Sequence, residues 1–291
     1  MRIAFFDSGF GGLSVLDAAR RMHPAHHYLY YADSLHAPYG GKPAAQVRDL
    51  VFSAADTIAA QNPDALVIAC NTATAVCIED LRARYRFPVI GMEPAVKPAL
   101  HAHEKKRVLV MATSLTLQES KLSELLERVD KNRRADKIAM DRLVDFAERG
   151  DFDVPRVADY LCEKLSHYRL NDYAAVVLGC THFIYFKPLL QSLFAPGTGF
   201  VTGNEGTVRH LFGQLDALTT RPPSAQVETP TQTDEPYMLP LEQASQFTDQ
   251  QGLATACLGT IEFFRSGVAS SVAELDPYFK QLALVHSLQT Q

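Results

Sequence analysis

The sequence predicts an α/β fold built from two related halves, in which helices cover mainly parallel sheets. The first observation is the rhythm of residues 3–201, where short, fully apolar runs alternate with segments of helical spacing. Such runs are typical of strands buried on both faces of a parallel sheet. The second observation is an internal similarity between the halves, described below. The third is the length of 291 residues, which is enough for roughly two domains.

The first half contains four apolar runs of strand type. Ile3–Phe6 ends at the polar, glycine-rich turn 7–12, and Asn62-Pro63 stops the long second helix as a breaker pair. The predicted strands are Ile3–Phe6, His27–Ala32, Leu66–Ala69 and Val89–Gly91. The predicted helices are Leu13–Met22, Lys42–Gln61 and Thr74–Tyr85.

The same pattern starts again near residue 107. The predicted strands of this half are Arg107–Thr113, Lys137–Met140, Ala175–Leu178 and Gly199–Val201. The predicted helices are 117–129, Val154–Tyr168 and Phe186–Phe194. Because strands again alternate with helices, a second parallel sheet is expected.

The C-terminal part has a different composition. Residues 220–240 are rich in Pro, Thr and Gln, which indicates a linker or a long loop. Leu241–Arg265 and Glu274–Leu288 have apolar residues at helical spacing and are predicted to form a helical tail, interrupted near Asp276-Pro277. The apolar face of the second tail helix needs cover, either from the first domain or from another subunit in a homodimer.

Composition and charge exclude several classes of protein. The chain has 28 Lys and Arg against 33 Asp and Glu, so no basic surface for nucleic acid is expected. No apolar run approaches the ~18–20 residues that span a bilayer. The five cysteines are odd in number and contain no CxxC pair, which is typical neither of a disulfide framework nor of a zinc site. These features predict a protein of the reducing cytoplasm without a bound metal.

Two cysteines follow apolar strands in equivalent places. Ala65–Thr72 aligns with Ala175–His182, since each consists of an apolar strand, a small residue, a cysteine and then hydrogen-bonding side chains. Ligands of open α/β sheets bind beyond the carboxyl ends of the strands. If the two halves face each other, Cys70 and Cys180 are therefore expected to enter one cleft from opposite sides.

Two facing thiols allow two kinds of chemistry. A disulfide redox couple is one, although such pairs usually stand close together in the sequence. The other is removal of a proton from one face of a carbon atom and delivery of a proton to the opposite face. The unperturbed thiol pKa near 8.5 lies within tuning distance of neutral pH. Asn71, Thr72 and Thr181 could hold a substrate carboxylate, and no lysine has the surroundings of a PLP site.

Asp7 and His182 stand at or near the same strand ends. Asp7 either caps the helix that begins near Gly12, or orients a substrate ammonium group and activates the first thiol. Residues 8–12 leave backbone amides free for an anion at a helix start, without the Lys-Ser/Thr of a P-loop. His182 can stabilise a thiolate or shuttle a proton. A phosphoryl-accepting role for Asp7 usually needs a second Asp two residues on, where Gly9 stands.

Six segments carry a resemblance to a known family. They are Asp7–Leu13, Tyr31–Gly40, Ala69–Ala73, Gly91–Ala95, Ala112–Thr116 and Leu178–Phe183. In these segments the chain resembles glutamate racemase, of the cofactor-independent aspartate/glutamate racemase superfamily. The two cysteine motifs, together with the first segment, are highly specific.

The resemblance implies two pseudo-symmetric α/β domains, residues 1–97 with 205–291 and residues 98–204, with the active site in the cleft between them. It implies racemisation of glutamate by two bases, with no cofactor, to supply D-glutamate for peptidoglycan. By motif, Cys70 and Cys180 are the acid/base residues and Asp7 and His182 assist them. A family glutamate near the second cysteine falls at Glu148, which is counted with the catalytic residues. The residues that it assigns to the substrate are Asp7, Ser8, Pro38, Tyr39, Gly40, Asn71, Thr72, Thr113, Thr116, Thr181 and His182.

Some segments depart from the family pattern. Val201–Gly206 replaces the usual Asp-Ser or Asp-Pro step, and the tail lacks the usual Thr-Ser-Gly-Asp-like ending. These departures concern assembly, regulation and substrate fit rather than the two-thiol chemistry. Two alternatives stay open: a racemase of aspartate or another amino acid, and a partner-binding paralogue without catalysis.

Overall fold

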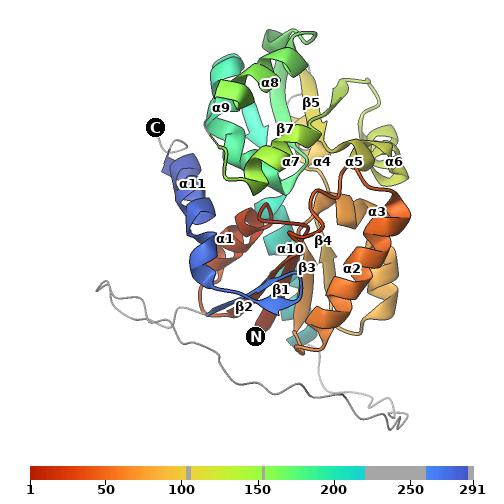
Figure 1. The fold of residues 1–291 in the computed structure, drawn as a ribbon. Helices are drawn as coiled ribbons and strands as arrows, with labels where there is room; N and C mark the ends of the chain where they lie inside the picture. Colours follow the sequence, from red (N-terminus) through yellow and green to blue (C-terminus); the bar gives the residue numbers. More distant parts are fainter. Residues whose placement is uncertain (103–105, 153–154, 220–259, 288–291) are drawn as a thin grey trace.

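The computed structural model describes residues 1–102, 106–152, 155–219 and 260–287. Its strands form two sheets in separate halves of the molecule (Figure 1). One sheet combines the N-terminal and C-terminal parts of the chain, and the middle of the chain forms the other. Among the described residues, every strand pair except β9–β10 is parallel, which confirms the predicted α/β class.

The first sheet has the strand order β10-β9-β2-β1-β3-β4. Its strands are β1 Arg2–Asp7, β2 His27–Ala32, β3 Ala65–Ile68, β4 Val89–Gly91, β9 Ile261–Arg265 and β10 Val268–Ala269. The helices α1 Leu13–Met22, α2 Ala44–Ala59, α3 Asn71–Arg84 and α10 Asn204–Thr219 belong to this half. Alternate side chains of β1 enter two different cores, Ile3 and Phe5 one of them and Ala4 and Phe6 the other, because helices cover both faces of the sheet.

The second sheet has the order β6-β5-β7-β8. Its strands are β5 Arg107–Ala112, β6 Ala135–Ala139, β7 Tyr173–Leu178 and β8 Gly199–Val201. The helical elements of this half are α4 Val96–Ala102, α5 Ser114–Gln118, α6 Ser120–Val129, α7 Asp141–Glu148, α8 Pro155–Leu165, η1 Leu170–Asp172, η2 Thr181–Phe186 and α9 Lys187–Leu193. The predicted helix 117–129 is two helices, because Glu119 has an extended backbone.

The C-terminal segment corrects one prediction. Ile261–Arg265, predicted as the end of a tail helix, is strand β9 and pairs in parallel with β2. An apolar run this short fits a helical or a strand period, and the edge of β2 decides between them by supplying hydrogen-bond partners. Phe263 is buried there beside Phe10 and Tyr30. The predicted linker 220–240 and the rest of that predicted helix, up to residue 259, lie outside the described residues.

The second predicted tail helix is present as η3 Val272–Leu275 and α11 Asp276–Ser287. Pro277 does not interrupt α11, because it stands in the first turn, where a missing N–H breaks no intrahelical hydrogen bond. Leu275 and Leu282 are buried, whereas Leu284 is half exposed. No helix within the described ranges is both long and apolar enough to cross a membrane.

Candidate active site

The two predicted cysteines lie at strand ends of different sheets. Cys70 follows β3 and caps the N-terminus of α3, whereas Cys180 follows β7 and directly precedes η2. Both are free thiols, and their exposed fractions are only 5% and 8%. This position beyond the carboxyl ends of parallel strands is where α/β proteins bind ligands.

The surroundings of Cys70 keep its thiol protonated. The Ala73 amide donates to the Cys70 sulfur at 3.4 Å, and the sulfur lies 3.6 Å from Ser8 Oγ. Burial, together with negative charge on Asp7 and on Cys180, raises the pKa of Cys70 to about 12, although the hydrogen bonds of Ala73 and Ser8 oppose this increase. A nearby positive charge, such as a substrate ammonium group, would bring this pKa back down.

The surroundings of Cys180 are different, because a histidine and a carboxylate stand beside it. His182 Nδ1 lies 3.6 Å from the Cys180 sulfur, and His182 Nε2 lies 2.7 Å from Glu148 Oε1. Burial by itself lowers the pKa of His182, but the hydrogen bonds and negative charges of Cys180 and Glu148 raise it well above its ordinary value. This direction favours the imidazolium form of His182, whose positive charge would stand next to Cys180.

Asp7 ends β1 and is completely buried. Its carboxylate accepts hydrogen bonds from the Gly9 amide at 2.9 Å and from Thr181 Oγ1 at 3.1 Å. Burial raises the pKa of Asp7 to about 6, although the positive charge of His182 opposes this increase. The carboxylate thus links the first glycine-rich turn to the second cysteine motif.

Three backbone amides of that glycine-rich turn already face side chains of the protein, in contrast to the prediction that they are free. The Gly9 amide is used by Asp7, the Phe10 amide donates to Glu148 Oε1 at 2.7 Å, and the Gly11 amide points to His182 Nε2 at 3.2 Å. A Cβ on Gly9 would overlap the Glu148 carboxylate, so a larger residue here must displace that carboxylate. The turn thus binds carboxylates of the protein itself, Asp7 and Glu148, where a ligand anion was expected.

Three predicted threonines meet across the boundary between the sheets. Thr72 Oγ1 lies 2.9 Å from Thr113 Oγ1 and 3.1 Å from Thr116 Oγ1, and the latter two are 2.9 Å apart. All three are buried, so their hydroxyl groups form a compact cluster of donors. Beside them, Asn71 Nδ2 donates to the Met92 carbonyl at 3.0 Å, while the buried Asn71 Oδ1 has no hydrogen-bond partner.

The remaining predicted residues surround this cluster and Cys70. Ser8 is buried next to Cys70, and Pro38 follows a cis peptide bond. Tyr39 is buried and donates to Asp33 Oδ2 at 2.6 Å. A Cβ on Gly40 would lie 2.6 Å from Thr113 Cβ, so the chain from the first half approaches the second closely here.

Two tyrosines that the sequence analysis missed brace the glycine-rich turn. Tyr30 donates to the Gly9 carbonyl at 2.7 Å, and Tyr185 donates to the Phe10 carbonyl at 2.8 Å. Both are fully buried. Nothing in the sequence distinguishes them from ordinary core aromatics of a strand and a helical turn, because their role depends on contacts with a distant segment.

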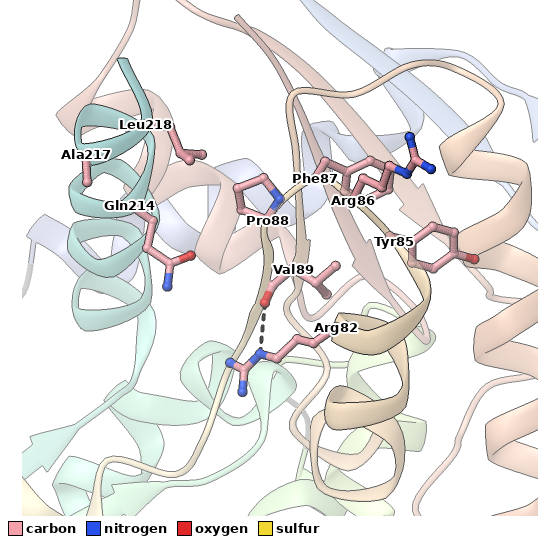
Figure 2. A pocket seen from close by; sticks show the side chains of 9 residues that line it. All are labelled: Arg82, Tyr85, Arg86, Phe87, Pro88, Val89, Gln214, Ala217 and Leu218. Atoms are coloured by element: carbon pink, nitrogen blue, oxygen red, sulfur yellow. Dashed lines mark hydrogen bonds between the residues drawn. The ribbon is translucent and has the colours of Figure 1, made fainter. Parts of the chain in front are cut away.

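A cavity of about 590 Å³ lies elsewhere, between the end of α10 and the segment that leads into β4 (Figure 2). Arg82 Nε donates there to the Val89 carbonyl at 3.2 Å. Val89 begins β4, so this cavity lies at the amino end of that strand, whereas Cys70 lies beyond the carboxyl end of the neighbouring strand β3. No residue predicted for the site lines it.

The fold and the paired cysteine motifs define the class of protein, and the family comparison agrees. Residues 14–211 match the Asp/Glu/Hydantoin racemase family model, so the chain belongs to that family. Within it, the similar curated proteins are glutamate racemases, which confirms the resemblance inferred from the motifs. "Glutamate racemase 2" of Bacillus subtilis (strain 168) is 47% identical over 213 residues, covering 72% of this chain and 80% of the relative. The enzyme of Halothermothrix orenii is 44% identical, with coverages of 72% and 83%.

Solved structures give the same result. The glutamate racemase from Thermus thermophilus, in complex with beta-chloro-D-alanine, is 31% identical, with a TM-score of 0.61 and coverages of 77% and 84%. The Escherichia coli glutamate racemase, in complex with L-glutamate and the activator UDP-MurNAc-ala, is 31% identical, with a TM-score of 0.69 and coverages of 74% and 82%.

Proposed function

We propose that this protein interconverts L- and D-glutamate by two proton transfers at Cα, with Cys70 and Cys180 as the two bases. The observation that carries the proposal is the pair of buried thiols at strand ends of two different sheets, in unlike electrostatic surroundings. The similarity to glutamate racemases supports glutamate as the substrate. The reaction involves no net electron transfer, because racemisation leaves the oxidation state of the substrate unchanged.

The reaction balances with the two cysteines alone. One cysteine, as thiolate, removes the Cα proton from one face, and the electron pair stays on Cα as a carbanion. The other cysteine, as thiol, then donates its proton to the opposite face. The two sulfurs have exchanged protonation states at the end, and the reverse direction begins from that state. General acid–base catalysis of this kind contributes about 10²–10⁴-fold per group.

The neighbours of each sulfur suggest which one starts as the thiolate. The positive charge of His182, held by Glu148, stands next to Cys180 and compensates a thiolate there. Cys70 has no such cation among the described residues that contact its sulfur, and its pKa is raised. Asp7 is placed to attract the substrate ammonium group. The positive charge of that group would help Cys70 to ionise when the reaction runs in the opposite direction.

The polar side chains around the sulfurs suit an amino-acid dicarboxylate. The hydroxyl cluster of Thr72, Thr113 and Thr116 can donate to one carboxylate, which also helps the carbanion because that carboxylate shares the developing charge. The unpartnered Asn71 Oδ1 can accept from the ammonium group. Ser8, Thr181 and the Pro38–Gly40 segment are proposed to contact the second carboxylate.

The proposal extends to organisation and cellular role. We assign residues 1–97 with 205–291 to one domain and 98–204 to the other, supported by the pairing of β9 with β2. We also propose a cytoplasmic homodimer that supplies D-glutamate for peptidoglycan. The activator UDP-MurNAc-ala in the Escherichia coli structure supports a link of such enzymes to that pathway.

The proposal is tested by incubating the purified protein with L-glutamate in deuterated water, without added PLP. Chiral chromatography should detect D-glutamate, and mass spectrometry should detect deuterium at Cα in the product. L-aspartate and other amino acids serve as a parallel panel. Racemisation of aspartate but not glutamate would move the assignment to the alternative substrate, and no exchange with any amino acid would favour the non-catalytic alternative.

A further inference from the structure

The C-terminal helix α11 contacts the candidate site from outside, on the side of Cys180. Figure 1 shows α11 beside α1 and reaching from the first half of the molecule towards the second. Its residue Tyr278 is buried, with an exposed fraction of 6%. Tyr278 is not part of the motifs that define the family resemblance, and the sequence analysis assigned it no role.

Tyr278 supports Glu148 in two ways. Its hydroxyl donates to the backbone carbonyl of Glu148 at 3.2 Å, where α7 ends. Its ring stacks on the Phe10 ring, with 4.5 Å between the centroids and an interplanar angle of 19°. Phe10 in turn donates its amide to Glu148 Oε1 at 2.7 Å. One side chain therefore contacts both the backbone of Glu148 and the residue that orients its carboxylate.

A second link from α11 reaches the same turn. Gln281 Nε2 donates to the Tyr185 carbonyl at 2.8 Å, and the Tyr185 hydroxyl donates to the Phe10 carbonyl at 2.8 Å. Phe10 is thus held from its ring by Tyr278 and from its carbonyl by Tyr185. Both links converge on Phe10, whose amide fixes the Glu148 carboxylate.

We propose that Tyr278 is a positioning residue that holds Glu148 against His182, and that it thereby supports proton transfer by Cys180 but not by Cys70. The inference rests on the proposed two-cysteine reaction. The asymmetry follows from the contacts: Glu148 and His182 lead to the Cys180 sulfur, whereas the Cys70 sulfur contacts Ser8 and the Ala73 amide.

Racemisation itself cannot reveal this asymmetry. Each turnover uses both cysteines in either direction, and an equilibrium constant of one requires equal kcat/KM for the two enantiomers. An irreversible elimination reaction measures proton removal from each face of Cα separately, because each enantiomer of the substrate presents its Cα proton to one cysteine. With 3-chloroglutamate, one cysteine thiolate takes the Cα proton, the electron pair forms the Cα–Cβ double bond, and the C–Cl bond breaks to release chloride. Water then hydrolyses the enamine to 2-oxoglutarate and ammonium.

The experiment compares Tyr278→Phe, which keeps the ring and loses only the hydroxyl, with the wild-type enzyme. Tyr168→Phe is the matched control, because its hydroxyl also donates to a backbone carbonyl, that of Lys137 at 3.3 Å, away from the site. The variant Cys180→Ser identifies the 3-chloroglutamate enantiomer whose elimination depends on Cys180. We expect Tyr278→Phe to slow elimination from that enantiomer about three- to tenfold and to leave the other unchanged. The kcat for racemisation should fall by a similar factor, with little change in KM.

The outcomes separate the inference from the proposed function. Equal slowing of both enantiomers, no slowing, or the same effect in Tyr168→Phe would overturn the positioning role while leaving the proposed function in place. A wild-type protein that does not racemise glutamate would overturn the proposed function and this inference with it. Gln281→Ala provides a second, independent variant, with thermal unfolding measured for each, and it should slow the same enantiomer.

Discussion

Asp7→Asn should make the folded protein more stable at neutral and alkaline pH while it lowers turnover. The Asp7 carboxyl group is completely buried, and burial raises its pKa from 3.8 to about 6. Asparagine has nearly the same shape and still accepts from the Gly9 amide, but it carries no charge that must be desolvated. The substitution therefore removes an electrostatic cost that the site bears for its chemistry.

The size and sign of the effect follow from the two pKa values. A rise from 3.8 to about 6 corresponds to about 3 kcal/mol of destabilisation of the charged form in the folded state. Because the folded-state pKa is the higher one, the folded protein binds the proton more tightly. The associated stability is fully present below pH 3.8 and is lost as the pH rises through about 6. The gain from Asp7→Asn should therefore be about 3 kcal/mol at pH 8 and about half of that at pH 5.

Urea unfolding at pH 5 and pH 8 measures this gain, and chiral chromatography measures turnover of the same samples. Asp159→Asn, at an exposed position of α8, is the control and should change stability by less than about 0.5 kcal/mol. Turnover of Asp7→Asn should fall about 10²-fold, with a smaller change in KM. An Asp7→Asn protein that is less stable than wild type at pH 8, or whose gain is equal at both pH values, would refute the reasoning.

Three further predictions follow from the same contacts. Gly9→Ala should lower kcat at least tenfold, because the added Cβ would overlap the Glu148 carboxylate and must displace it. Normal turnover would contradict this contact. Glu148→Gln should lower the pKa of His182, because the negative charge of Glu148 helps to raise it. The alkaline limb of the pH–rate profile should therefore shift to lower pH, and an unshifted profile would argue against the Glu148–His182 pair. Truncation after Arg265 removes α11 and its buried Leu282. It should lower the melting temperature and the activity, or change the oligomeric state measured by light scattering. An unchanged protein would show that the tail is dispensable.

Much of the fold was predictable because each central strand is a short apolar run between helices. The runs that became β1, β3 and β7 are buried on both faces, so their sequences contain little except apolar residues. The strand β9 was not predictable, because five residues fit either period and the edge of β2 that selects the strand is more than 200 residues away in the sequence. The helix α10 was not predicted either. Its sequence has no strong start or stop signal, and the helix is held in place by its contacts with α1.

The candidate site was predictable where residues follow strand ends and unpredictable where it depends on distant contacts. Asp7 and Cys70 could be placed together because they follow neighbouring parallel strands of one sheet, and Cys180 was expected beside them if the two halves face each other. The amides of the glycine-rich turn were expected to bind an anion, yet Glu148, from a helix 138 residues away, occupies one of them. Tyr30 and Tyr185 could not be recognised, because a buried tyrosine shows its hydrogen-bond partner only in the folded structure.

The most direct test of the central claim compares Cys70→Ser and Cys180→Ser in the same assays. Serine keeps the shape of the side chain, but its hydroxyl is far harder to ionise than a thiol. We predict that each variant loses nearly all glutamate racemisation and that each still eliminates chloride from one enantiomer of 3-chloroglutamate, with opposite enantiomers for the two variants. If either variant keeps near-normal racemisation, or if both retain elimination from the same enantiomer, then the two cysteines do not act as bases on opposite faces of Cα.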